Sequence, residues 1–265
     1  MNTTGWKLLE ETKFFQDLAA RYFLEDYQGQ GGFTDMGQLL RMAKRAGLER
    51  DKLGLDLACG NGRPGLFVIR RNRCKLVGLG NSQEALEIGQ HRAERYALEA
   101  YASFVRGDLS NALPFADNTF DGVICSEGFE AHNLARLESL YQEVWRVLKP
   151  GGGFAFFYRN LEPGGLEQES PAVQQNLGQG QIDHAALLQQ SGFSTTRAAE
   201  VTGELRAMSR RMKSAYEERG VIEKLRTSLG AVLTDDLYAQ MLRLHNQIAN
   251  NQIHRWFFST TKPQA

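Results

Sequence analysis

The 265-residue chain is 42% hydrophobic and 23% charged, which is ordinary for a globular protein and sufficient for one large α/β domain. Its 31 lysines and arginines balance its 31 aspartates and glutamates, so it lacks the net field that draws proteins to nucleic acid or acidic membranes. No uncharged apolar run approaches the roughly 18 residues of a membrane span, and the N-terminus shows no signal-peptide pattern. The cysteines Cys59, Cys74 and Cys125 lack CxxC spacing, so we expect free thiols and a cytoplasmic protein.

Residues 1–50 show helical patterns rich in aromatic side chains, broken by QGQGG at 28–32. We predict that they form an N-terminal helical cover. From about residue 52 onward, short apolar runs alternate with helical patterns. The predicted strands are KLGLDLA (52–58), KLVGLG (75–80), ASFVRGD (102–108), FDGVICS (120–126) and GGFAFFY (152–158). This alternation predicts an α/β fold with a doubly wound, mostly parallel sheet and helices on both faces.

The C-terminal third departs from simple alternation. We predict a core over 51–202, a helical cap inserted at 203–250, and a final strand of the core at 251–265 that contains HRWFFSTTK. Within the cap, we expect Thr234 to be the N-cap of a helix whose first turn carries Asp235 and Asp236.

The stretch LDLACGNGRPGLFV at 55–68 places glycines directly after a predicted buried strand. In an open α/β sheet, ligands bind beyond the carboxyl ends of the strands, and the first strand-to-helix turn forms part of that site. Gly60 and Gly62 allow a ligand to approach the backbone closely, and Pro64 suits the first turn of the following helix. This pattern alone is a weak sign of a nucleotide site.

Polar residues at the ends of later strands point to the same edge. Asp108 follows the third predicted strand, where its carboxylate could accept a hydrogen bond from the exocyclic amine of a purine; the alternative is a turn-forming aspartate. The fourth strand delivers Ser126 and Glu127 to this edge.

Three motifs in this order, LDLACGNG, GDLSNALPFADNTFDGVI and EVWRVLKPGGGFAFF, resemble class I S-adenosylmethionine-dependent methyltransferases, and more narrowly the small-molecule methyltransferases with an LPF-DN-FD signature. The resemblance covers roughly residues 52–160. It implies a Rossmann-like sheet with an antiparallel last strand and S-adenosyl-L-methionine as the cofactor. Beyond residue 160 only the layout matches.

The resemblance also implies roles for individual residues. Gly60 and Gly62 would line the methionine part of the cofactor, and Asp56 would hold the turn and is a candidate partner of the ammonium group through water. Asp108 would accept from the adenine amino group, with Leu109 against the ring. The expected cofactor-binding residues are Asp56, Gly60, Asn61, Gly62, Gly80, Asn81, Asp108, Leu109, Cys125 and Ser126.

One position departs from the family. The family usually ends its second strand with an acid that binds both ribose hydroxyls, and Gly80 stands there in this chain. A missing charge-assisted hydrogen bond costs about 1.5–3 kcal/mol. Three explanations remain: Asn81 or Glu84 takes over, the cofactor differs, or methyl transfer has been abandoned. We favour Asn81, because every other motif is intact.

Methyl transfer from a sulfonium is an in-line displacement, and positioning and desolvation of the reactants supply much of its rate acceleration. A general base is needed only for a protonated acceptor. Glu127, Glu130 and His132 leave the fourth strand where the family places its acceptor groups, and we take Glu127 and His132 as candidate catalytic residues. The alternative for Glu130 and His132 is helix capping.

We therefore expect a methyltransferase acting on the O, N or C atom of a small-molecule acceptor, as a monomer or homodimer. We expect no nucleic-acid partner, no membrane partner and no metal, since His184, His245 and His254 lack ligand spacing. Two alternatives remain open. One is a repurposed methyltransferase-fold protein that binds a cofactor without methyl transfer, as Gly80 suggests. The other is an NAD-dependent oxidoreductase, whose dinucleotide fingerprint Gly60, Gly62 and Gly65 would satisfy.

Overall fold

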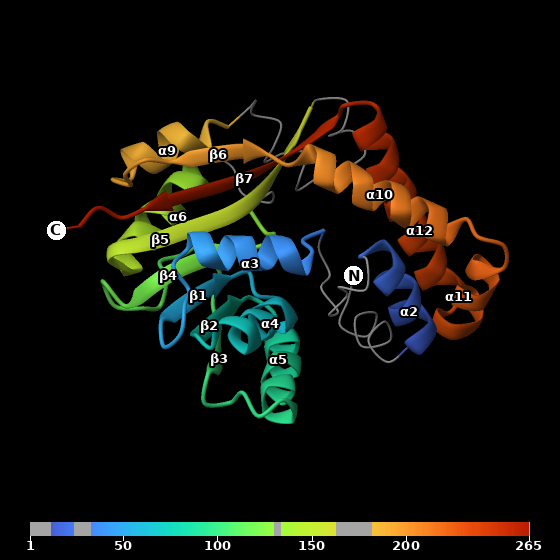
Figure 1. Cartoon of the computed structure of the whole chain (residues 1–265), viewed down its shortest axis with the longest axis horizontal. Helices are drawn as coiled ribbons and strands as arrows, with labels where there is room; N and C mark the ends of the chain where they lie inside the picture. The colour runs from blue at the N-terminus through green and yellow to red at the C-terminus, as the bar shows by residue number, and fades with distance from the viewer. Residues whose placement is uncertain (1–11, 24–32, 130–133, 163–181, 265) are drawn as a thin grey trace.

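The protein's structure is a computed structural model that describes residues 12–23, 33–129, 134–162 and 182–264. A seven-stranded sheet in the order β3-β2-β1-β4-β5-β7-β6 organises it (Figure 1). The strands are β1 (Leu53–Leu57), β2 (Lys75–Gly80), β3 (Ala102–Arg106), β4 (Phe120–Cys125), β5 (Leu148–Leu161), β6 (Arg197–Glu200) and β7 (Ile253–Thr261).

The first five strands are parallel, and β7 runs antiparallel to both β5 and β6. The strand order reverses between β1 and β4, so the chain leaves these two strands in opposite directions along the sheet. Such a switch point opens a crevice at the carboxyl ends of the strands. The predicted fold class, doubly wound and mostly parallel with an antiparallel last strand, is confirmed.

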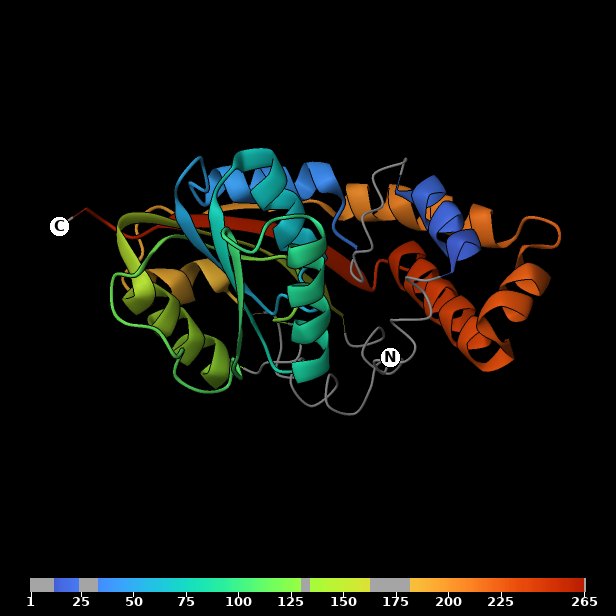
Figure 2. The same ribbon diagram turned by 90° about the horizontal axis from the view of Figure 1, so that it is seen from below.

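Helices cover both faces of the sheet (Figures 1 and 2). One face is covered by α3 (Met36–Arg45), α4 (Arg63–Asn72) and α5 (Gln83–Arg95), and the other by α6 (Leu134–Val147) and α9 (His184–Gln190). These helices bury apolar side chains against each face, in two separate core clusters. Helix α3 starts at a capping box, in which Asp35 and Gln38 each bond the other's backbone N–H.

Glycines let α3 approach the sheet closely. Gly54 in β1, Gly122 in β4 and Gly153 in β5 are register partners in one row. A Cβ at Gly122 would lie 2.1 Å from the carbonyl oxygen of Ala46, just after α3, and a Cβ at Gly153 would lie 2.9 Å from the Ala46 backbone. At Gly54 the Leu48 side chain fills the corresponding space.

The remaining helices form an arm beside the sheet (Figures 1 and 2). It comprises α2 (Lys13–Tyr22), α10 (Thr202–Tyr216), α11 (Val221–Leu229) and α12 (Ala231–Ala249). The arm helices α10–α12 occupy the predicted cap range, between β6 and β7. The N-terminal range is divided, because α2 packs on α10 and α11 whereas α3 packs on the sheet.

The expected N-cap at Thr234 is wrong. Helix α12 begins three residues earlier, after Gly230, and the Thr234 hydroxyl donates to the Gly230 carbonyl from inside the first turn. Thr234 is fully buried, so tertiary packing places it. No helix among the described residues has the length and apolar character needed to cross a bilayer.

The glycine row yields a stability prediction. Gly122→Ala should destabilise the fold by about 3 kcal/mol or more, because backbone atoms cannot move aside as a flexible side chain can. Gly203→Ala is the matched control, since nothing lies within 4 Å of a Cβ added at that helical glycine, and it should stabilise by about 0.5–1 kcal/mol. Urea unfolding measures both; a Gly122→Ala midpoint equal to the wild-type value would contradict the close-packing argument.

Candidate functional site

A cavity of about 460 Å³ opens at the carboxyl ends of the parallel strands, at the switch point. Its walls come from the segments that follow β1, β2, β3 and β4. The lining residues are Ala58, Gly60, Leu79, Gly80, Asn81, Ser82, Ala85, Gly107, Asp108, Leu109, Ser110 and Gly128. Five of the ten predicted cofactor-binding residues therefore line the same cavity: Gly60, Gly80, Asn81, Asp108 and Leu109.

The glycine turn is held from behind by α5. Gly60 and Gly62 have φ values of 54° and 73°, a region that favours glycine. A Cβ at Gly62 would lie 2.5 Å from the Phe104 ring, so a side chain there would displace the turn. Arg92 of α5, itself buried, donates to the Asn61 carbonyl at 2.7 Å. Asn61 and Gly62 thus shape the turn, although neither lines the cavity.

Asp108 stands on the cavity wall after β3. One of its carboxylate oxygens accepts a 2.8 Å hydrogen bond from the backbone N–H of Ser110, which fixes the carboxylate in a local turn. The turn-forming and ligand-facing interpretations are therefore compatible. Leu79 and Leu109 provide apolar surface on the same walls.

The position at which this chain departs from the family pattern, at the end of the second strand, also lies at this cavity. Gly80 ends β2, and Asn81 follows it with an exposed side chain at the cavity wall. A Cβ at Gly80 would lie 3.1 Å from the Leu86 side chain and 3.5 Å from the Cys59 sulfur. Because both neighbours are side chains, this backbone can accept a residue larger than glycine with a small adjustment.

Asp56 is buried beneath the turn, in the last part of β1. Burial raises the pKa of its carboxyl from 3.8 to about 7. A Cβ at Gly65 would lie 2.8 Å from Asp56 Oδ2, so the third glycine of the turn allows α4 to pack against this carboxyl group. Burial, together with the Asp56 charge, also raises the pKa of the Cys59 thiol, which keeps that thiol protonated.

The end of β4 and the segment that follows it reach the cavity through Gly128. Cys125 is buried and its thiol lies 3.5 Å from the Glu127 carbonyl oxygen, and the Ser126 carbonyl accepts from the Thr34 hydroxyl at 3.3 Å. Gly128 lines the cavity with φ at 138°, and a Cβ there would lie 2.7 Å from the Ala58 side chain. The two strand exits therefore touch at the switch point.

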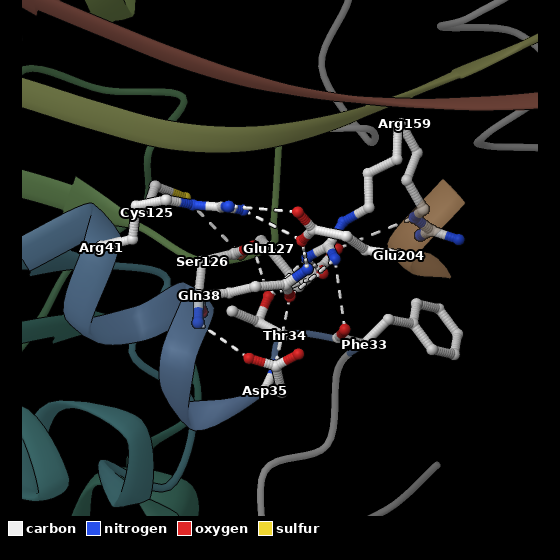
Figure 3. Close-up of polar contacts among 11 residues, drawn as sticks. Phe33, Thr34, Asp35, Gln38, Arg41, Cys125, Ser126, Glu127, Arg159 and Glu204 are labelled. Carbon is white, nitrogen blue, oxygen red and sulfur yellow. Dashed lines mark hydrogen bonds and ion pairs between the residues drawn. The ribbon is translucent and has the colours of Figure 1, made fainter. Parts of the chain in front are cut away.

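Glu127, one of the candidate catalytic residues, is bound to cations (Figure 3). Its Oε1 accepts from Arg255 Nη2 at 2.7 Å, and its Oε2 lies 3.7 Å from Arg159 Nε. The Thr34 hydroxyl, whose single proton can go to the Ser126 carbonyl or to Glu127, also lies 3.1 Å from Oε1. A base must be free to receive a proton from the acceptor, whereas this carboxylate already accepts hydrogen bonds from protein groups. The other candidate, His132, lies outside the described residues, as does Glu130.

Several site residues escaped the sequence patterns. Ala58 and Gly107 lie at the ends of the strands predicted at 52–58 and 102–108, and Gly128 lies two residues beyond the strand predicted at 120–126, but none of the three was expected to line the site. Arg255 had a weaker signal, an arginine on the alternating inward face of the final strand. Across residues 12–23, 33–129, 134–162 and 182–264, no group of three or more His, Cys, Asp or Glu side chains is arranged to hold a metal ion.

The raised pKa of Asp56 predicts a pH-dependent stability. Its folded pKa lies above the unfolded value, so its neutral form is favoured by folding, and stability falls as pH rises from about 4 to about 7. Asp56→Asn cannot ionise, so from pH 5 to pH 8 its unfolding free energy should rise by about 2–3 kcal/mol relative to wild type. Urea unfolding of both proteins at the two pH values measures this difference. A constant difference would show that the carboxyl is ionised in the folded protein throughout.

Comparisons with known proteins agree with this geometry. Residues 55–152 match the family described as a methyltransferase domain. The sterol 24-C-methyltransferase ERG6 of Saccharomyces cerevisiae is 36% identical over 116 residues, which cover 44% of this chain and 30% of that protein. The matches span 30% to 37% of the length of the first three curated relatives.

Solved structures share the fold at low identity. Phosphoethanolamine N-methyltransferase 2 of Haemonchus contortus, in complex with phosphomonomethylethanolamine and S-adenosylhomocysteine, has a TM-score of 0.77 at 17% identity, covering 99% of this chain and 61% of that one. The cyclase SpnF has a TM-score of 0.62 at 20% identity, covering 87% and 82%. Residues 55–152 therefore match a methyltransferase domain, and the structure shares its fold with solved methyltransferases.

Proposed function

We propose that this protein binds S-adenosyl-L-methionine in the switch-point cavity and transfers its methyl group to a small-molecule acceptor. The observation that carries the proposal is the cavity itself, whose wall combines the glycine turn at Gly60, the apolar surface of Leu79 and Leu109, and the carboxylate of Asp108. The matched sterol methyltransferase and the phosphoethanolamine methyltransferase support a small molecule as acceptor.

The residues that line this cavity fit the chemical groups of the proposed cofactor. An adenine needs apolar surface on its faces and an acceptor for its amino group, which Leu109 and Asp108 supply. The methionine part needs close backbone approach, which Gly60 and Gly128 allow. The ribose hydroxyls need polar partners, and the amide of Asn81 is at the cavity wall where the second strand ends.

When bound, the sulfonium would supply an activated methyl group. The chain's own residues would orient it, because a displacement in line depends on the relative position of donor and acceptor. Arg92 holds the turn through the Asn61 carbonyl, and Gly128 packs against Ala58 where the exits of β1 and β4 meet. A rigid cavity therefore reduces the freedom that the reactants must lose.

A second function has one observation in its favour. No carboxylate stands at Gly80, and the fold neighbour SpnF is described as a cyclase. A protein of this fold that binds the cofactor without methyl transfer would match both facts. Turnover assays separate the two, because only a methyltransferase converts S-adenosylmethionine to S-adenosylhomocysteine when acceptors are supplied.

Titration calorimetry tests the binding proposal. We expect S-adenosylmethionine and S-adenosylhomocysteine to bind with dissociation constants of roughly micromolar size, and NAD not to bind. Asp108→Ala should lower the affinity for S-adenosylmethionine and for S-adenosylhomocysteine by about tenfold or more, because a hydrogen bond to a charged group is lost. Asp108→Asn is the matched variant: it keeps an oxygen for the Ser110 N–H and should lose less. Binding of NAD alone would contradict the proposal and favour the oxidoreductase alternative.

A second pair of variants tests the replacement for the missing acid. If Asn81 binds the ribose, Asn81→Ala should weaken S-adenosylhomocysteine binding by about tenfold, whereas Gly80→Asp should change it by less than about threefold. Asn111→Ala, at an exposed asparagine outside the cavity wall, is the control. If Gly80→Asp instead raises the affinity for S-adenosylhomocysteine by about tenfold or more, Asn81 does not compensate for the missing acid.

A further inference from the structure

The most deeply buried charge near the cavity is Arg255. Its side chain is fully buried in β7, where a guanidinium persists only if its hydrogen bonds are satisfied. Arg255 Nη2 donates to Glu127 Oε1 at 2.7 Å and to Thr34 Oγ1 at 2.6 Å. Its Nη1 donates to Gln38 Oε1 at 3.0 Å and to the Phe33 carbonyl at 3.2 Å. We call these five residues the Arg255 cluster; Figure 3 labels its members Phe33, Thr34, Gln38 and Glu127.

The cluster joins parts of the chain that are far apart in sequence. Glu127 follows β4, Arg255 lies in β7, and Thr34 and Gln38 belong to the start of α3. The Arg255 guanidinium also lies over the Phe157 ring in β5, 4.3 Å from its centre, so a cation–π contact adds to its hydrogen bonds. One planar group therefore sets the relative positions of three elements at the cavity edge.

Fixing Glu127 also fixes the cavity wall. Arg255 holds the Glu127 side chain, and Thr34 lies within hydrogen-bond distance of both the Glu127 carboxylate and the Ser126 carbonyl. The next residue is Gly128, which lines the cavity and packs on Ala58, a lining residue that follows β1. A shift of Glu127 would be passed along the backbone to this contact.

We propose that Arg255 and Glu127 are positioning residues for the cofactor cavity, which act by holding the backbone of residues 126–128 in place. This inference rests on the proposed function for its cofactor, but the backbone order that it predicts is independent of any ligand. In this role Glu127 contributes hydrogen-bond acceptors, and its capacity to take up a proton is not used.

Two pairs of variants distinguish positioning from base catalysis. Glu127→Gln keeps an oxygen that can accept from Arg255 and Thr34, whereas Glu127→Ala removes the acceptors. Arg255→Lys keeps the charge but cannot reproduce the fork that bonds Glu127 and Gln38 together. Arg226→Met is the control, because Arg226 forms an exposed ion pair with Asp235 in the arm.

Amide hydrogen exchange of the full chain without ligand provides the first measurement. Glu127→Ala and Arg255→Lys should speed exchange at residues 126–128 by about tenfold or more, since a bond to a charged group is lost. In Glu127→Gln and Arg226→Met, the exchange rates at residues 126–128 should stay within about threefold of the wild-type rates. Unchanged exchange in folded Glu127→Ala and Arg255→Lys would overturn the inference.

Calorimetry with S-adenosylhomocysteine provides the second measurement. Affinity should fall by about tenfold or more in Glu127→Ala and Arg255→Lys and by less than about threefold in Glu127→Gln. Faster exchange with unchanged affinity would overturn the inference, as would equal losses in Glu127→Gln and Glu127→Ala. If the wild-type protein does not bind S-adenosylhomocysteine, the proposed function fails, and the exchange measurement alone decides whether Arg255 orders this segment.

Discussion

The direct contact between the end of α3 and the backbone of the sheet is the constraint on which the rest of the site depends. Gly54, Gly122 and Gly153 form a row across β1, β4 and β5, and this row leaves space for Ala46 and Leu48. The approach is too close for any side chain at Gly122. It determines how deep α3 lies, and therefore where the start of the helix meets the carboxyl edge of the sheet.

The polar chemistry of this edge follows from that placement. With α3 seated on the glycines, Thr34 and Gln38 reach Arg255 in β7. A buried guanidinium is costly to desolvate, and its acceptors come from two elements that only tertiary folding brings together. Gln38 in turn bonds Glu204 of α10, which Arg41 also binds through two hydrogen bonds. The arm is thus connected to the cavity edge through a continuous set of hydrogen bonds.

Local sequence patterns were sufficient to predict the strands of the core and to locate the edge of the sheet at which the cavity opens. The parallel strands were predicted because short apolar runs alternate with helical patterns along this part of the chain. The strand ends pointed to Gly60 and Asp108, and the family resemblance added Gly80, Asn81 and Leu109. Glu127 was located at the right edge, but its bond to Arg255 joins residues 128 positions apart, and no local pattern records such a pair. The N-terminal range looked like one cover, because α2 and α3 have similar amphipathic patterns; which surface each helix covers is decided by packing partners elsewhere in the chain.

The arm helices α10, α11 and α12 leave the sheet at the end of β6 and return at the start of β7, and these two strands are hydrogen-bonded neighbours. The Val201 N–H donates to the Arg255 carbonyl at 2.7 Å, which closes the base of this excursion. Entry and exit are therefore fixed side by side, whatever length of chain lies between them. In evolution, the arm could lengthen, shorten or be exchanged without shifting the register of any strand, so that one sheet and one cavity could serve acceptors of different size and shape.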